Sequence, residues 1–243
     1  MPTALVTGAS SGIGAATARR LAAEGFRVVC AARRADRVEA LAAEIDGVAV
    51  ACDITSADDV ARLAAEVGDT LDVLVNNAGG AVGLEPVAEA DLDAWEQMLA
   101  TNLIGTTRVT KALLPALTAA GGAIIFVTST AADWGYEGGA GYCAAKAGER
   151  AVVEALRLEL FDQPVRIMEI CPGMVRTDEF ALTRFADDKE KADKVYAGVD
   201  EPLTADDVAD TISFMATRPA HVNLDRITIR PRAQAAQYKV FRG

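Results

Sequence analysis

The stretch TGASSGIGAATARRLAAEG, residues 7–25, joins a short apolar strand to a helix through three glycines, with the spacing G-x-x-x-G-x-G. The preceding run Ala4–Val6 is typical of a buried strand, and residues 15–22 are strong helix formers. A glycine turn before a helix is an anion site, because the first-turn N–H groups are unpaired and a missing Cβ lets a pyrophosphate approach. The glycines could instead serve only a tight turn.

The strand-and-helix alternation continues along the chain, as short β-branched runs between longer Ala/Leu-rich segments. Continuous apolar strands separated by helices indicate a parallel sheet covered on both faces. We therefore predict one α/β domain over residues 1–243, a Rossmann-type doubly wound sheet of about seven strands. The expected strands are residues 3–7, 27–32, 48–52, 72–75, 123–128, 165–170 and 226–230.

Two segments depart from this alternation. Residues 172–203 contain no clean strand, which predicts an excursion over the carboxyl edge of the sheet, where such folds bind substrates. The tail, residues 231–243, is polar and is expected to be irregular and able to reach a neighbouring subunit.

The composition excludes several function classes. With 35 acidic and 24 basic residues the net charge is −11, which argues against nucleic-acid binding and requires local basic residues for any anionic substrate. No apolar run approaches the roughly 18 residues of a membrane span. The first strand begins almost at Met1, which leaves no room for a signal peptide, so we expect a cytoplasmic protein without membrane contact.

Cysteine and histidine usage argues against a metal site or disulfides. Cys30, Cys52, Cys143 and Cys171 show no C-x-x-C spacing and lie in or beside apolar runs, so buried free thiols are expected. Within its predicted helix, Cys143 is interpreted as a packing residue. The one histidine, His221, is interpreted as structural.

The second predicted strand favours NADP over NAD. Its end reads Cys-Ala-Ala-Arg-Arg, so Ala32 and Arg33 stand where an NAD site would carry an acidic residue for the ribose 2′-hydroxyl. An arginine can hold a 2′-phosphate by charge-assisted hydrogen bonds, although Arg33 and Arg34 could simply be a solvated pair opening a helix. Asp53-Ile54 follows the third strand and Asn76-Asn77-Ala78-Gly79 follows the fourth, at positions that face a cofactor.

Three further side chains suggest acid/base chemistry. The strand over residues 124–128 ends in Ser129, and Tyr142 and Lys146 follow on a helical pattern. Their i, i+4 spacing puts both on one helix face. A phenol with an ordinary pKa of about 10 is a poor base at neutral pH, but a neighbouring ammonium and an oxidised nicotinamide favour the phenolate. Taken singly, each residue is more often structural, so the prediction rests on their combination.

With these residues together, the chain resembles the short-chain dehydrogenase/reductase family over nearly its whole length. The family's T-G-x-x-x-G-x-G, N-N-A-G and Y-x-x-x-K motifs match residues 7–14, 76–79 and 142–146. The resemblance implies an oxidoreductase with Tyr142 as acid/base, Ser129 bonding the substrate oxygen, Lys146 holding the ribose and Asn102 positioning a water. It also implies NADP, a small-molecule substrate and a homotetramer. The cofactor is expected against Gly8, Ser10, Ser11, Gly12, Ile13, Gly14, Arg33, Arg34, Asp53, Ile54, Asn77, Ala78, Gly79, Tyr142, Lys146, Pro172, Gly173, Val175 and Thr177.

Within that family the chain is most similar to the NADP-dependent 3-hydroxy acid dehydrogenases of the serine 3-dehydrogenase and malonic semialdehyde reductase type. The similarity lies in residues 83–86, 134–139, 172–180 and 219–223, whereas Cys171-Pro172-Gly173 replaces the subfamily's E-P-G. A 3-hydroxy acid needs a basic partner for its carboxylate, for which bidentate arginine is best suited. Arg184 is the first candidate, Arg176 the second, and either could instead be a solvated loop residue. Trp134 and Tyr136 are candidates for the pocket wall, or for core or surface.

Two other functions stay open at this point. One is a reductase of the same family that acts on a 3-oxoacyl thioester or a neutral carbonyl and would use the same residues. For the thioester it would need a basic patch for an acidic carrier protein, and no dense Lys/Arg run is present. A non-catalytic NADP-binding regulator would not need the complete set Asn102, Ser129, Tyr142 and Lys146.

Overall fold

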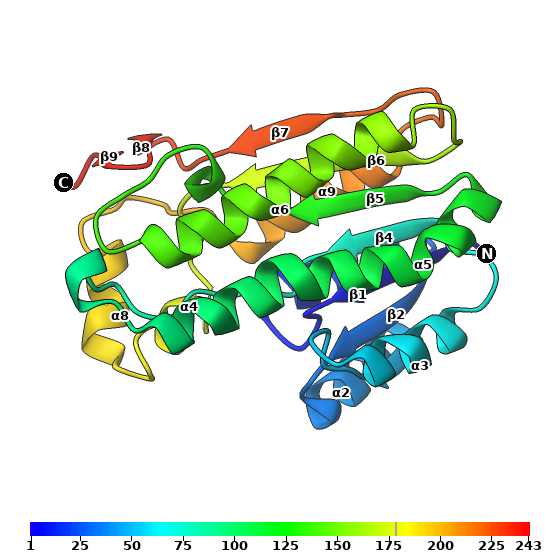
Figure 1. Cartoon of the computed structure of the whole chain (residues 1–243), viewed down its shortest axis with the longest axis horizontal. Coiled ribbons are helices and arrows are strands. Elements are labelled where there is room, and N and C mark those ends of the chain that lie inside the picture. The colour runs from blue at the N-terminus through cyan, green and yellow to red at the C-terminus, as the bar shows by residue number, and fades with distance from the viewer. Residues whose placement is uncertain (178) are drawn as a thin grey trace.

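A parallel sheet forms the centre of the molecule, with strand order β3-β2-β1-β4-β5-β6-β7 (Figure 1). The structure is a computed structural model that describes residues 1–177 and 179–243; Asp178, inside the predicted excursion, lies outside the described residues. The doubly wound fold is confirmed, and every expected strand is found with its ends shifted by two residues at most. The strands are β1 (Thr3–Thr7), β2 (Arg27–Ala32), β3 (Val48–Ala51), β4 (Val73–Asn76), β5 (Ala123–Val127), β6 (Arg166–Pro172) and β7 (Arg226–Ile229).

Helices cover both faces of this sheet. One face is covered by α1 (Gly12–Ala23), α2 (Ala35–Ile45) and α9 (Ala205–Ala216). The other face is covered by α3 (Ala57–Val67), α5 (Thr106–Ala120) and α6 (Ala140–Glu159). In Figure 1, α5 and α6 cross in front of the strands and α9 lies behind them. Across residues 1–177 and 179–243, no helix combines the length and the apolarity that crossing a membrane requires.

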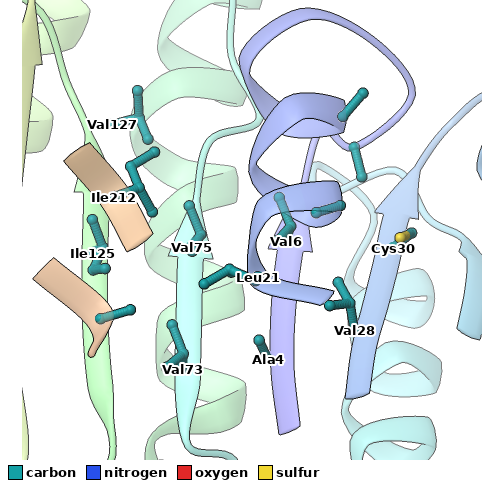
Figure 2. Packing of buried hydrophobic residues seen from close by; sticks show 14 of the residues in the cluster. Ala4, Val6, Leu21, Val28, Cys30, Val73, Val75, Ile125, Val127 and Ile212 are labelled. Atoms are coloured by element: carbon teal, nitrogen blue, oxygen red, sulfur yellow. The ribbon is translucent and has the colours of Figure 1, made fainter. Parts of the chain in front are cut away.

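The alternation of side chains along each strand divides the core into two layers. Val6 packs with Leu21 of α1 and Ile212 of α9, whereas its neighbour Leu5 packs into the opposite layer. Figure 2 shows Leu21 and Ile212 lying against the strand residues of one face, among them Val75. Strands buried on both faces are rigid supports, so the loops at their carboxyl ends begin from fixed positions.

The segments beyond the carboxyl ends of the strands are short helices. The predicted excursion contains α7 (Phe180–Arg184) and α8 (Lys189–Tyr196), and Val175 bridges Leu203 where the excursion returns to the sheet. On the same side lies α4 (Leu92–Leu99), at the arrowhead end of the strands in Figure 1. The remaining elements are η1 (Val87–Glu89), the π-helix η2 (Ala100–Gly105) and η3 (Thr130–Ala132).

The C-terminal tail was expected to be irregular, and that expectation is wrong. It forms a small antiparallel pair, β8 (Gln234–Ala236) and β9 (Lys239–Val240), held to its own chain. The side chain of Gln234 is buried, and its Oε1 accepts a hydrogen bond from the N–H of Met174 at 2.8 Å. Polar residues that look solvated in the sequence thus bond to the backbone of the excursion, which no local pattern reveals.

The cysteines agree with their interpretation as free thiols. Cys30, Cys52 and Cys171 are buried and Cys143 is half-buried. Burial raises the pKa of Cys30 and of Cys52 to about 11, so both stay protonated at neutral pH. His221 lies exposed in the turn before β7.

Candidate active site

A cavity of about 690 Å³ opens at the carboxyl edge of the sheet, over the point where the strand order reverses between β1 and β4. Ligands of open α/β sheets bind at such switch points. All of the residues that the sequence places at the cofactor line this cavity, from the glycine turn at Gly8 to Thr177 in the excursion. Ser129, Tyr142 and Lys146 line it as well.

The glycine turn is shaped by a side chain that follows β4, the strand beside β1 in the sheet. Asn77 Nδ2 donates to the carbonyl oxygens of Thr7 at 2.9 Å and of Gly8 at 3.3 Å. Gly8 has a φ of +66°, and a Cβ on Gly14 would lie 2.3 Å from the Gly8 carbonyl oxygen. In the described chain, Ser11 at the start of α1 does not cap the helix with its side chain, and Gly12, Ile13 and Gly14 of the first turn line the cavity.

We predict that Gly14→Ala destabilises the protein by about 1–3 kcal/mol, because the added methyl group overlaps backbone atoms that cannot move away. The overlap lies at the Gly8 carbonyl oxygen and the Asn77 amide, 2.3 and 2.6 Å from the new Cβ. Urea unfolding measures the difference. Gly135→Ala is the matched control, since its Cβ meets nothing within 4 Å; equal effects of the two substitutions would contradict the steric argument.

Basic side chains cluster at the β2 end of the cavity. Arg34 donates to Ser10 Oγ at 2.7 Å, to Ser11 Oγ at 2.8 Å and to Glu179 Oε2 at 2.7 Å. Arg37 also pairs with Glu179. Partial burial opposes ionisation of Glu179, but the hydrogen bonds from Arg37 and Arg34 outweigh it and lower the pKa of its carboxyl to about 2.

Arg33 differs from Arg34 in its surroundings. Its side chain is exposed and lines the cavity directly after β2. The ion pairs of Glu179 with Arg34 and Arg37 join the excursion to the β2–α2 connection across 145 and 142 residues. Sequence reasoning missed both Glu179 and Arg37 in this role, because a pairing at such separation leaves no local pattern.

Three of the four predicted catalytic side chains reach the cavity, from α6 and from the segment after β5. Tyr142 and Lys146 come from α6 and are buried, and the Tyr142 ring stacks edge-on against Phe180 with centroids 6.0 Å apart. Ser129 follows β5, and its Oγ accepts a hydrogen bond from the N–H of Ala131 at 3.1 Å. Lys146 Nζ donates to the Val127 carbonyl oxygen at 3.0 Å.

Asn102 lies behind the cavity wall and not among its lining residues. It sits in η2, where its Oδ1 accepts from the N–H of Gly80 at 3.1 Å. Its Nδ2 donates to the carbonyl oxygens of Gly80 at 2.9 Å and Met98 at 2.8 Å. The amide thus fastens the Gly79-Gly80 segment, which itself lines the cavity.

A buried carboxylate that the sequence analysis missed accompanies Lys146. Glu149 Oε2 lies 2.8 Å from Lys146 Nζ, and the two side chains are 2% and 5% exposed. Burial raises the pKa of Glu149 to about 7, although the ammonium of Lys146 acts to lower it. Burial acts to lower the pKa of Lys146, but Glu149 and Tyr142 outweigh it and the pKa is raised.

Of the four candidate substrate residues, Arg184 and Tyr136 line the cavity. Arg184 Nη1 donates to Tyr136 Oη at 2.9 Å, and its Nε donates to the Gly83 carbonyl oxygen at 2.9 Å. Burial raises the pKa of Tyr136, although Arg184 acts to lower it. This contact between α7 and two loops brings a guanidinium to the wall of the cavity that holds Tyr142.

The other two candidates lie elsewhere, which corrects the sequence-based expectation. Trp134 is 61% exposed and is not among the residues that line the cavity. Arg176 lines a second cavity with Asp200 and Arg230, and its guanidinium lies 5.6 Å from the Tyr196 ring centroid. Side chains that are close together in an irregular segment can point to different sides. Trp134 is near Tyr136 in the sequence and Arg176 is near Arg184, but only Tyr136 and Arg184 line the cavity.

The C-terminal hairpin supplies two cavity residues that the sequence analysis also missed, Gln234 and Gln237. Gln237 Oε1 accepts from Thr130 Oγ1 at 2.5 Å, directly after Ser129. The tail therefore helps to form its own chain's cavity.

Comparisons with known proteins agree with this arrangement. A family model described as short chain dehydrogenase matches residues 2–187. An uncharacterised oxidoreductase of Mycobacterium tuberculosis is 58% identical over 96% of this chain and 92% of its own. A serine 3-dehydrogenase of Rhizobium radiobacter is 41% identical over 99% of this chain and 98% of its own.

Solved structures show the same similarity. A closed form of serine dehydrogenase complexed with NADP⁺ is 36% identical and superposes with a TM-score of 0.92. The superposition covers 96% of both chains. The sheet, the helices on both faces and the excursion therefore follow a known arrangement over almost the whole chain.

Proposed function

The chain belongs to the short-chain dehydrogenase family, and from this we propose that it is an NADP-dependent oxidoreductase acting on a small 3-hydroxy acid such as serine or 3-hydroxypropionate. The observation that carries the substrate class is the guanidinium of Arg184 in the wall of the cavity that also holds Tyr142. The names of the relatives, a serine 3-dehydrogenase and a serine dehydrogenase bound to NADP⁺, support the same proposal.

The cavity fits a phosphate-bearing dinucleotide on its own features. Gly12 begins α1 and lines the cavity, and a Cβ there would lie 3.4 Å from the Thr177 side chain, which would narrow the space where a pyrophosphate would accept N–H hydrogen bonds. Arg33 and Arg34 supply positive charge at the end of β2 for a 2′-phosphate. Bound NADP supplies or accepts the hydride, which is the chemistry of its nicotinamide.

The proton is exchanged by Tyr142. In oxidation its ionised hydroxyl takes the proton of the substrate hydroxyl, and in reduction it gives that proton back. Ser129 donates a hydrogen bond to the same substrate oxygen as charge develops on it. The ammonium of Lys146, one helical turn after Tyr142, favours the ionised phenol, and Asn102 fixes the Gly79-Gly80 wall beside Lys146.

Arg184 holds the substrate carboxylate. Its bonds to Gly83 and Tyr136 use two of the five N–H donors of a guanidinium and fix the plane of the fork. A carboxylate is matched by such a fork through two parallel charge-assisted hydrogen bonds. On a protein with a net charge of −11, a local cation of this kind is needed to attract an acidic substrate.

We predict that Arg184→Ala raises KM for acidic substrates about 10- to 100-fold, because the substrate carboxylate loses its bidentate charge-assisted hydrogen bonds. The KM of neutral alcohols stays within about threefold, because they make no such pair. Initial-rate kinetics measures both substrate classes. Tyr136→Phe is the control, since it removes the hydroxyl that Arg184 bonds while keeping the charge. Equal increases for acids and alcohols in Arg184→Ala would remove the carboxylate role.

The proposed function as a whole is tested by initial-rate oxidation of serine, 3-hydroxypropionate and 3-hydroxyisobutyrate. Each is offered with NADP and with NAD, and simple secondary alcohols serve as neutral controls. Turnover of the acids with NADP supports the proposal. Turnover of alcohols or thioesters alone would withdraw the substrate class and leave the family's hydride chemistry in place.

A further inference from the structure

One charged side chain stands where the sequence of α6 leads one to expect an apolar residue. The buried stripe of this helix runs through Tyr142, Ala145, Lys146, Glu149 and Val153. Such a stripe normally carries apolar residues against the sheet. A carboxylate there costs a large desolvation energy unless it is paired and hydrogen-bonded. Glu149 is paired, and its partner is the lysine of the site.

We propose that Glu149 is a positioning residue for Lys146: its carboxylate holds the ammonium against the carbonyl of Val127 and offsets its positive charge at Tyr142. This inference rests on the proposed function, because it assigns Glu149 a part in the work of the Tyr142 and Lys146 pair. It adds a residue outside the cavity lining to that site.

The positioning follows from the hydrogen bonds of the ammonium. Lys146 Nζ donates to Val127 O at 3.0 Å and to Glu149 Oε2 at 2.8 Å. An ammonium has three donors, so within the described residues these two bonds leave one for the cavity that Lys146 lines. The carboxylate and the carbonyl together fix the direction of that donor. A lysine without this second anchor would rotate about its long side chain.

The charge balance follows from the groups around the pair. Lys146 faces Glu149 from the same helix, Tyr142 acts on Lys146 from the preceding turn, and Glu169 acts on Glu149 from β6. Glu169 has partners of its own: Thr128 Oγ1 donates to it at 2.6 Å, and Arg226 Nε of β7 lies 3.6 Å away. The Cys171 thiol, also on β6, bonds Thr128 and Arg226. Glu149 is therefore the carboxylate that directly opposes the ammonium of Lys146.

A merely structural role is the alternative. Glu149 could satisfy a buried ammonium and contribute only to folding, in which case its removal would lower stability without changing how the rate depends on pH. The two roles are therefore separated by a pH profile and not by a melting temperature.

The test compares Glu149→Gln with Glu169→Gln. The first keeps an amide oxygen for Lys146 but removes the charge; the second removes an equally buried charge that does not contact Lys146. In Glu149→Gln the uncompensated ammonium favours the phenolate more strongly. We expect the acid-side midpoint of kcat/KM for alcohol oxidation to fall by about one pH unit. We expect Glu169→Gln to move it by less than about 0.3 unit. An unchanged or raised midpoint in Glu149→Gln, or an equal shift in both variants, would overturn the proposal.

A second readout separates this inference from the proposed function. Phenolate absorbance near 295 nm is titrated in wild type and in Tyr142→Phe, and the difference isolates the ionisation of Tyr142 without any turnover. The same difference in the Glu149→Gln background is expected to show its midpoint lowered by about one unit. Failure of Tyr142→Phe to reduce activity would refute the acid/base role, whereas an unmoved absorbance midpoint would refute the role of Glu149. If Glu149→Gln does not fold, Glu149→Leu fits the apolar stripe and is expected to show the same direction of shift.

Discussion

Replacing Tyr142 by phenylalanine is expected to lower kcat by a factor of about 1,000 or more while leaving the fold intact, since positioned acid/base catalysis contributes factors of about 10²–10⁴. Phenylalanine keeps the ring that packs edge-on against Phe180 and loses only the hydroxyl. Steady-state rates with NADP in both directions measure the effect. Cofactor affinity from titration calorimetry is expected to change little, because the phenol acts on the substrate oxygen.

Tyr136→Phe is the matched control for this experiment. Tyr136 lines the same cavity, but its hydroxyl accepts a hydrogen bond from Arg184 and does not face the reacting oxygen in the proposed function. We expect its kcat to stay within about tenfold of the wild type. Full activity of Tyr142→Phe would instead favour a non-catalytic NADP-binding regulator with a contaminating activity.

The parts of this protein that the sequence could predict are those with a local pattern. The glycine turn, the ends of the strands and the Tyr142 and Lys146 pair each depend on residues close together in the chain, and the structure has them at one cavity. The fold follows from the same kind of information, because apolar runs that alternate with helices favour a doubly wound sheet.

The parts that it could not predict depend on contacts between distant segments. Glu179 meets Arg34 across 145 residues, and Gln237 meets Thr130 across 107 residues. Even Glu149, three residues after Lys146, was missed, because an i, i+3 pair of opposite charge is usually a solvated surface pair. Only the burial of that helix face distinguishes it, and burial depends on how α6 packs on the sheet.

The preference for NADP over NAD is expected to depend on Arg33, and the loss of activity in Arg33→Ala is expected to be second only to that in Tyr142→Phe. We predict that Arg33→Ala lowers kcat/KM with NADP about 100-fold, since each hydrogen bond to a charged group contributes about 1.5–3 kcal/mol and a tenfold change corresponds to about 1.4 kcal/mol. With NAD, which lacks the 2′-phosphate, the change is expected to stay within about twofold. Initial rates with both cofactors, and direct NADP⁺ titration, measure the two effects.

Arg37→Ala is the matched control. It also removes one positive charge, four residues further along the chain, but the side chain of Arg37 pairs with Glu179 and does not line the cavity. If long-range field alone attracted NADP, the two variants would weaken NADP binding equally, and the loss would shrink as ionic strength rises. A direct contact instead predicts a large effect confined to Arg33 and to NADP.

Equal losses with NADP and NAD in Arg33→Ala would contradict the 2′-phosphate role. A loss found only in Arg34→Ala would assign that role to the neighbouring arginine, whose guanidinium would then have to exchange Glu179 for the phosphate.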